Sequence, residues 1–200
     1  MAKLFFIIAI FLSFQSKAEI SNNLKLGLKS YFNDDFILAH QYLSLSAQSG
    51  NGEAQYLLGH MYEYGEGVEI DQHQSFRWYL ASAKNGIPPA QYSVSLKYSF
   101  GIGIKKNINE GLIWLEAAAR QGHNFAQFKL GLDLIEIGEK QSGLMWLRIA
   151  SLANVTDAKK AYSQIAPAYT ESQHHNIFEA AKRCISSSYI IANQIKCSVK

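Results

Sequence analysis

The stretch AQYLLGHMYEYGEGVEIDQHQSFRWYLASAKNG, residues 54–86, decides the fold, because it recurs as AQYSVSLKYSFGIGIKKNINEGLIWLEAAARQG at residues 90–122. Ala54, Ala90 and Ala126 follow one another at a constant spacing of 36 residues. The tryptophan of the first stretch and its closing glycine recur at the same spacing. Self-similarity at such a period is typical of a repeat array, in which each unit packs on the next.

Each unit is predicted to be a helix, a glycine turn and a second helix. Residues 52–64 and 72–85 carry apolar side chains at helical spacing. Gly65 and Gly67 frame the turn, because glycine adopts positive φ without strain, and Asp71 stands where a helix N-cap is expected. The sequence therefore predicts an all-α protein, a right-handed α-solenoid of antiparallel helix pairs with a period of about 36 residues.

The same pattern extends to both ends of the chain. The first and fourth units have a shorter turn between their two helices. The last unit lacks both the tryptophan and the glycine turn, as expected because terminal repeats are atypical. The predicted helical domain covers residues 19–188 and precedes a tail at 189–200. Its units are expected at about 20–50, 51–86, 87–122, 123–154 and 155–188.

Residues 1–18 have the pattern of a secretory signal peptide. Lys3 precedes the apolar run at residues 4–12, and Ser16 and Ala18 occupy the small-residue positions of a cleavage site. The run is too short for a bilayer span, which needs about 20 residues. The pattern predicts export, to a bacterial periplasm or to the outside. An uncleaved N-terminal anchor is the alternative.

Two cysteines, Cys184 and Cys197, lie near the C-terminus. In an exported protein such a pair predicts a disulfide, which would constrain the unfolded chain by about 3 kcal/mol. A metal site with His174 and His175 is the alternative, although the spacing matches no compact zinc motif.

Composition and motifs argue against nucleic acid and against catalysis. The net charge is only +3, and the lysines and arginines are scattered instead of clustered. The Gly-x-Gly triplets join helix to helix, which is not the setting of a dinucleotide site. The acidic residues at 63–71 surround a turn and are expected to be solvated. We therefore expect no catalytic residue, no metal and no cofactor.

The repeat positions resemble the Sel-one-like repeat (SLR) family, a variant of the tetratricopeptide repeat (TPR). The resemblance covers roughly residues 20–155. In the second unit it rests on a small residue, aromatics, a Gly-x-Gly-Val turn, an aspartate, Trp-Tyr and a closing glycine. The matching residues are Ala54, Tyr56, Leu58-Gly59, Tyr62, Gly65-Glu66-Gly67-Val68, Asp71, Trp78-Tyr79, Ser82-Ala83 and Gly86. The resemblance implies an SLR/TPR-like fold and an adaptor or scaffold that holds a partner on a curved surface.

The first helix of each pair is expected to line the concave side, where a partner would bind. A glutamine recurs there beside the repeat alanine, and its amide could bond an extended peptide backbone; a solvated helix position is the alternative. The positions predicted to face outward and bind the partner are Gln55, His60, Glu63, Gln91, Tyr98 and Gln127.

The sequence thus predicts an exported, non-catalytic protein–protein interaction scaffold of the cell envelope, with a protein or peptide partner. The alternative is a protein that binds or hydrolyses cell-wall material, because some related repeat proteins are linked to peptidoglycan or β-lactam binding. Those relatives carry one cysteine pair per repeat, whereas this chain has one pair in total.

Overall fold

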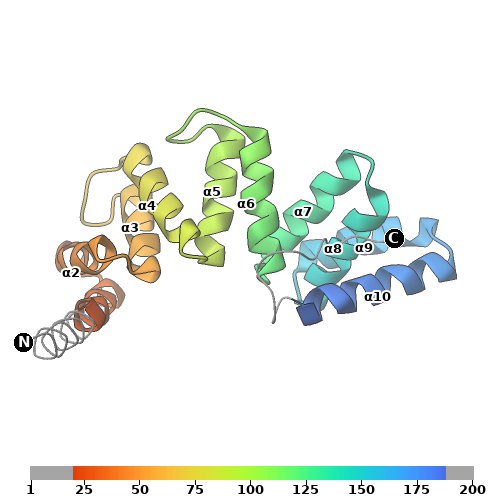
Figure 1. Cartoon of the computed structure of the whole chain (residues 1–200), viewed down its shortest axis with the longest axis horizontal. Helices are drawn as coiled ribbons and strands as arrows, with labels where there is room; N and C mark the ends of the chain where they lie inside the picture. The colour runs from red at the N-terminus through yellow and green to blue at the C-terminus, as the bar shows by residue number, and fades with distance from the viewer. Residues whose placement is uncertain (1–19, 188–200) are drawn as a thin grey trace, which may run out of the picture. The chain divides into compact units, whose positions relative to one another are not determined.

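The structure, a computed structural model, describes residues 20–187, and the regular elements in that range are all helices (Figure 1). A helix over residues 20–32 comes first. The others are α2 (Phe36–Gln48), α3 (Gly52–Tyr64), α4 (Gln72–Lys84), α5 (Pro88–Phe100), α6 (Ile108–Arg120), α7 (Asn124–Glu136), α8 (Lys140–Leu152), α9 (Thr156–Ile165), the 3-10 helix η1 (Ala166–Ala168) and α10 (Glu171–Ser187). The predicted all-α fold of consecutive helix pairs is confirmed.

The chain forms two compact units. The described part of unit 1 comprises residues 20–90 and 100–106, and that of unit 2 comprises residues 91–99 and 107–187. In each pair we call the first helix A and the second helix B, and the connection between them is the inner turn. The A helices are residues 20–32, α3, α5 and α7, and the B helices are α2, α4, α6 and α8.

Side-chain caps begin several helices where the sequence predicts them. The Asp71 carboxylate accepts the amides of His73 and Gln74 at the start of α4. Asn107 does the same for Glu110 at the start of α6. These bonds satisfy amides that have no partner inside the helix, and each such cap contributes about 1 kcal/mol.

The core of unit 1 lies between α2 and α3. Its fully buried members are Ala39, Leu43, Ala47, Ala54, Leu58 and Met61. Val68 of the inner turn and Trp78 of α4 both pack against this cluster. Small residues in both helices let their backbones approach closely, while the leucines fill the space between them.

The core of unit 2 is larger because α10 packs on α8. Trp146 and Leu144 of α8 are buried together with Leu115 of α6 and Ile177 of α10. Pro167 lies in η1, which separates α9 from α10. The two C-terminal helices thus cover an apolar face of α8 that would otherwise meet water.

The inner turns of unit 1 pack directly on the preceding B helix. A Cβ at Gly67 would lie 2.5 Å from the Phe36 carbonyl oxygen and 2.9 Å from the Ile37 nitrogen. A Cβ at Gly103 would likewise collide with the Gln72 carbonyl oxygen. Both glycines also have positive φ, of +70° and +69°. Glycine at these positions is therefore required by the backbone conformation and by the close contact together.

His123 is the N-cap of α7 in unit 2. Its Nδ1 accepts the Ala126 amide at 3.2 Å, and its ring stacks on Tyr92 with centroids 4.7 Å apart. Burial lowers the pKa of His123 below its usual value. The cap requires an unprotonated Nδ1, and a positive charge at a helix N-terminus is unfavourable. The hydrogen bond therefore favours the same neutral ring that burial favours.

We expect acid to destabilise unit 2 through this residue. An unfolded histidine binds a proton near pH 6.5, whereas the folded ring with its lowered pKa stays neutral. The contribution is therefore complete above about pH 6.5 and is lost as pH falls through the folded pKa. In urea unfolding at about pH 7.5 and about pH 5, the wild type should lose about 1 kcal/mol more than His123→Asn.

The control variant His123→Asn introduces the residue that caps α3, Asn51, at the equivalent position, so the cap is kept and does not titrate. Other titrating groups contribute equally to both proteins and cancel in the comparison. Equal losses in the two proteins would contradict the assignment.

Several predictions fall on residues outside the described range. The signal peptide at 1–18 and the tail at 189–200 are among them. Cys197 and the side chain of Cys184 also lie outside it, so the disulfide stays a prediction. Among the described helices, none combines the length and the apolarity needed to cross a bilayer.

Candidate functional site

The second repeat carries polar residues where the third carries apolar ones. One period separates His60 from Leu96 and Glu66 from Ile102. The repeat fold accepts leucine and isoleucine at these two positions, so it does not require histidine and glutamate there. Polar side chains at such positions indicate a role other than packing.

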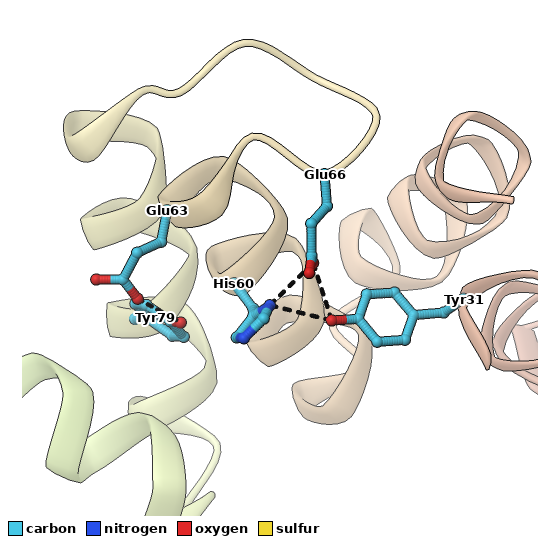
Figure 2. A network of polar contacts seen from close by, with 5 residues as sticks. All are labelled: Tyr31, His60, Glu63, Glu66 and Tyr79. Carbon is cyan, nitrogen blue, oxygen red and sulfur yellow. Dashed lines mark hydrogen bonds and ion pairs between the residues drawn. The ribbon is translucent and has the colours of Figure 1, made fainter. Parts of the chain in front are cut away.

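Three side chains of unit 1 meet in one polar cluster, which we call the Tyr31 cluster (Figure 2). Tyr31 comes from the first A helix, His60 from α3 and Glu66 from the inner turn that follows it. The Tyr31 hydroxyl donates to Glu66 Oε2 at 2.9 Å, and His60 Nδ1 lies 2.9 Å from the same oxygen. The hydroxyl and Nδ1 are 3.0 Å apart. The inner turn is thereby tied both to its own A helix and to the preceding one.

The acceptor at the centre of the Tyr31 cluster determines where the protons lie. A carboxylate only accepts, so the 2.9 Å contact with Glu66 places a proton on Nδ1 of His60. Burial and the hydrogen bond to Glu66 raise the pKa of Tyr31 above its usual value. Tyr31 is therefore a fixed donor, and His60 Nε2 and the second oxygen of Glu66 are the polar atoms of the cluster that remain for a ligand.

Tyr64 borders this cluster at the last position of α3. Its ring centroid lies 4.4 Å from that of His60, and the side chain is largely exposed. The imidazole thus contacts an aromatic ring that is otherwise largely exposed. An exposed ring beside polar acceptors is the combination that protein interfaces favour.

A second polar pair lies on the α4 side of the same helix (Figure 2). The Tyr79 hydroxyl donates to Glu63 Oε2 at 2.9 Å. Burial raises the pKa of Tyr79, and the Glu63 charge and hydrogen bond add to the effect. The ring of Tyr79 also fills the space beside Gly59, where a Cβ would come within 2.6 Å of it. This pair joins α3 to α4 and so supports the helix that carries His60.

The Tyr31 cluster shares one feature with a catalytic site. A histidine oriented by a carboxylate resembles the base of a hydrolase, but catalysis also needs a nucleophile in hydrogen-bond contact with it. Among the described residues, the His60 ring bonds Tyr31 and Glu66, and the Tyr31 hydroxyl is held protonated. Within residues 20–187, no group of three or more His, Cys, Asp or Glu side chains is placed to hold a metal ion.

The expectation that the recurring glutamines face outward is wrong. Gln55, Gln91 and Gln127 are all buried. Gln55 Nε2 donates to the Ala47 carbonyl at 3.0 Å, and Gln127 Nε2 donates to the Ala119 carbonyl at 3.0 Å. Each amide therefore bonds a last-turn carbonyl of the preceding B helix, which has no donor within its own helix. Binding of a partner by these residues is not tested, but their amides are already engaged within the fold.

The oxygen of each glutamine meets the residue that ends helix B of its own repeat. Asn85 Nδ2 donates to Gln55 Oε1 at 2.8 Å, and Gln121 Nε2 donates to Gln91 Oε1 at 2.7 Å. In the fourth repeat the corresponding residue is Ala153, which has no donor, and Gln127 Oε1 is buried without a hydrogen-bond partner. One unpaired buried acceptor costs about 1–3 kcal/mol.

Ala153→Asn should supply the missing donor and raise the free energy of unfolding by about 1 kcal/mol. Ala153 has φ −80° and ψ 15°, close to the −80° and 6° of Asn85, and both residues are exposed, so asparagine fits there without strain. Urea unfolding measures the gain. The same substitution in a Gln127→Leu background should give no gain, and an equal gain there would show that the bond is not its cause.

The other predicted site residues fall into two groups. His60 and Glu63 lie on α3 and take part in the polar contacts of Figure 2. Tyr98 is half-buried on α5, and its carbonyl accepts the Asn107 amide. Sequence reasoning missed Tyr31 and expected Glu66 to be solvated, whereas Glu66 is half-buried and bonded to two side chains. The sequence did offer one indication, because Glu66 of the second repeat differs from Ile102 at the same position of the third.

Comparisons with known proteins agree with the helix pairs. The Sel1 repeat family model matches residues 25–51, 52–87 and 88–123. One similar solved structure is that of a protective antigen present in uropathogenic Escherichia coli strains, which displays an SLR fold. Its sequence is 25% identical, and the superposition has a TM-score of 0.69 and covers 85% of this chain and 38% of the antigen. A Sel1 repeat protein from Oxalobacter formigenes is 29% identical with a TM-score of 0.65, covering 78% of this chain and 69% of that one. The chain thus spans less than half the length of the Escherichia coli antigen. No curated protein matches the sequence.

Proposed function

Because this chain is a Sel-one-like repeat protein, and such proteins generally mediate protein–protein interaction, we propose that it is a non-catalytic scaffold that holds a protein partner at the Tyr31 cluster of unit 1. The partner would be held on the A-helix side, where the N-terminal helix, α3 and its inner turn bring Tyr31, His60 and Glu66 together. Export to the cell envelope is part of the proposal and rests on the signal pattern of residues 1–18.

One observation carries this proposal: the second repeat has a polar cluster, reachable from solvent, at positions where the third repeat has Leu96 and Ile102. The His60 side chain is 32% exposed and that of Glu66 is 21% exposed, so a partner can contact both. The cluster keeps two polar positions for a ligand, His60 Nε2 and the second carboxylate oxygen of Glu66, beside the exposed ring of Tyr64. A site of this size and composition suits a side chain of another protein.

The test replaces the cluster with residues that the chain itself uses at the same repeat positions. His60→Leu with Glu66→Ile reproduces Leu96 and Ile102 of the third repeat, so the helix pair should remain folded. The tagged full-length protein and this variant are crosslinked gently in their native envelope, and the captured proteins are identified. The wild type should enrich one protein, and the variant should lose at least about ninety per cent of it.

The matched control makes the same chemical changes nearby, at exposed positions outside the cluster. His73→Leu with Glu53→Ile removes one exposed histidine from α4 and one exposed glutamate from the start of α3. This control should retain the partner, and circular dichroism should show equal helicity in all three proteins. Equal capture by the cluster variant would disprove the site, and enrichment of wall fragments without protein would favour the cell-wall alternative.

A further inference from the structure

Three A helices end, within unit 1, on an exposed aromatic residue. Phe32 is the last residue of the N-terminal helix, Tyr64 of α3 and Phe100 of α5, and they occupy the same repeat position. Their exposed fractions are 77%, 62% and 66%. Aromatic side chains are more often buried than left in water, and here three of them recur in an exposed setting at one register position. Such a row is a feature of the surface and not of the core.

These aromatics belong to a larger apolar surface, which we call the inner-turn edge: residues 32–38, 64–72 and 100–106. The contacts of Gly67 with Phe36 and of Gly103 with Gln72 hold its three segments side by side. Within the described part of unit 1, every exposed large hydrophobic side chain except Leu45 lies on this edge: Phe32, Ile37, Leu38, Tyr64, Ile70, Phe100 and Ile102.

The opposite edge of unit 1 provides an internal comparison. Where the B helices end, the exposed residues are polar or glycine: Gln48, Ser49, Gly50, Glu53, Lys84 and Asn85. Both edges consist of turns between helices of the same repeats, so the repeat geometry alone does not require apolar side chains at either. Contiguous exposed apolar side chains on one edge only mark an interaction surface.

The charges on this edge indicate its occupant. Residues 31–76 include seven carboxylates and neither a lysine nor an arginine, although the whole chain has a net charge of +3. Asp34, Asp35 and Glu69 are exposed on the inner-turn edge beside Phe32 and Tyr64. At the Phe100 end the sign changes, because Lys105 and Lys106 are exposed there. A docked segment would therefore be held in one direction by charge.

We propose that the inner-turn edge docks a segment of the partner that combines apolar anchors with lysine or arginine side chains. The apolar side chains cover the row of Phe32, Tyr64 and Phe100, and the basic side chains lie against Asp34, Asp35 and Glu69. The exposed ring of Tyr64 adds a surface on which an arginine or lysine can stack. An anionic membrane surface does not fit, because it would be repelled by the same carboxylates. This inference rests on the proposed function and specifies the chemistry of the partner.

The experiment uses labelled peptides of defined composition and the full chain. Three peptides of equal length are compared by fluorescence anisotropy. The first combines leucine and phenylalanine with lysine and arginine, and the second combines the same apolar residues with glutamate. The third combines serine and glycine with lysine and arginine. Only the first should bind, and its affinity should fall at least about tenfold between low and moderate salt. Equal binding of the glutamate peptide, or binding of the purely polar basic peptide, overturns the proposal.

Surface variants connect that binding to the edge. Phe32→Ser with Tyr64→Ser should weaken the first peptide at least about tenfold, while Leu45→Ser, which removes an exposed leucine away from the edge, should leave it unchanged. Asp34→Lys with Glu69→Lys should weaken the first peptide and allow the glutamate peptide to bind. Unchanged affinity in either double variant overturns the proposal. Two other results would also overturn it: binding of the wild type to anionic vesicles, or self-association of the wild type, if the Phe32→Ser with Tyr64→Ser variant abolishes it.

The capture experiment separates this inference from the function on which it rests. If the Phe32→Ser with Tyr64→Ser variant still captures the protein that the wild type captures, the scaffold function stands and the edge is not its docking surface. If the wild type captures no protein, the scaffold function itself fails.

Discussion

Replacing Gly67 by alanine should lower the free energy of unfolding by about 2 to 5 kcal/mol. An L-residue at φ +70° costs about 1–2 kcal/mol. The added Cβ would also lie 2.5 Å from the Phe36 carbonyl oxygen, a backbone atom that cannot rotate away, and overpacking of this kind costs about 1–3 kcal/mol more. Urea unfolding followed by circular dichroism measures the loss.

Gly86→Ala is the matched control, because it shares the backbone strain without the contact. Gly86 has φ +81°, and a Cβ placed there would have no neighbour within 4 Å. Its loss should therefore be about 1–2 kcal/mol, from the backbone term alone. Gly103→Ala should follow Gly67→Ala, since its Cβ would meet the Gln72 carbonyl. Equal losses at Gly67 and Gly86 would mean that the inner turn does not rest on the preceding helix.

Gln55→Ala should cost about 2 to 3 kcal/mol, the second large effect. The substitution removes two hydrogen bonds, one to the Ala47 carbonyl and one from Asn85, each with a net value of about 1 kcal/mol. It also leaves a void at a buried site, which adds to the loss. Thermal and urea unfolding should both show the change, with helicity of the folded protein preserved.

Gln127→Ala tests the explanation, because this residue makes the same bond to the preceding helix but has no donor for its oxygen. Its loss should be about 1 kcal/mol smaller than that of Gln55→Ala, since alanine also removes the unpaired acceptor. A larger loss at Gln127 than at Gln55 would refute the assigned roles. A binding experiment with glutamine-to-alanine variants would therefore measure stability as well as recognition.

The sequence was sufficient to predict the helix pairs, because packing positions repeat with the backbone. Ala54, Ala90 and Ala126 are all fully buried, so their period of 36 residues marks a packing position and reveals the fold directly. The helix bounds of α3 follow from the cap at Asn51 and the glycine at 65. Local chemistry and the period point to the same structure here.

The candidate site was predicted only in part, because periodicity does not distinguish a polar residue in water from one inside the fold. Gln55 recurs with the packing period and proved to be buried, so its regular spacing was a packing signal. Tyr31 and Glu66 are 35 residues apart and belong to different repeats, and their contact depends on how the inner turn rests on the preceding unit. That arrangement is set by backbone contacts at Gly67, which a sequence pattern does not report.

The glutamine bonds have a consequence for how such a chain can grow. Gln55 and Gln127 each reach back to a main-chain carbonyl, and every residue has that group whatever its side chain. The bond between successive repeats is therefore independent of the neighbour's sequence. A duplicated or transplanted repeat brings the glutamine that bonds it to the preceding repeat. The array can therefore lengthen by whole repeats while the surface residues of each repeat diverge.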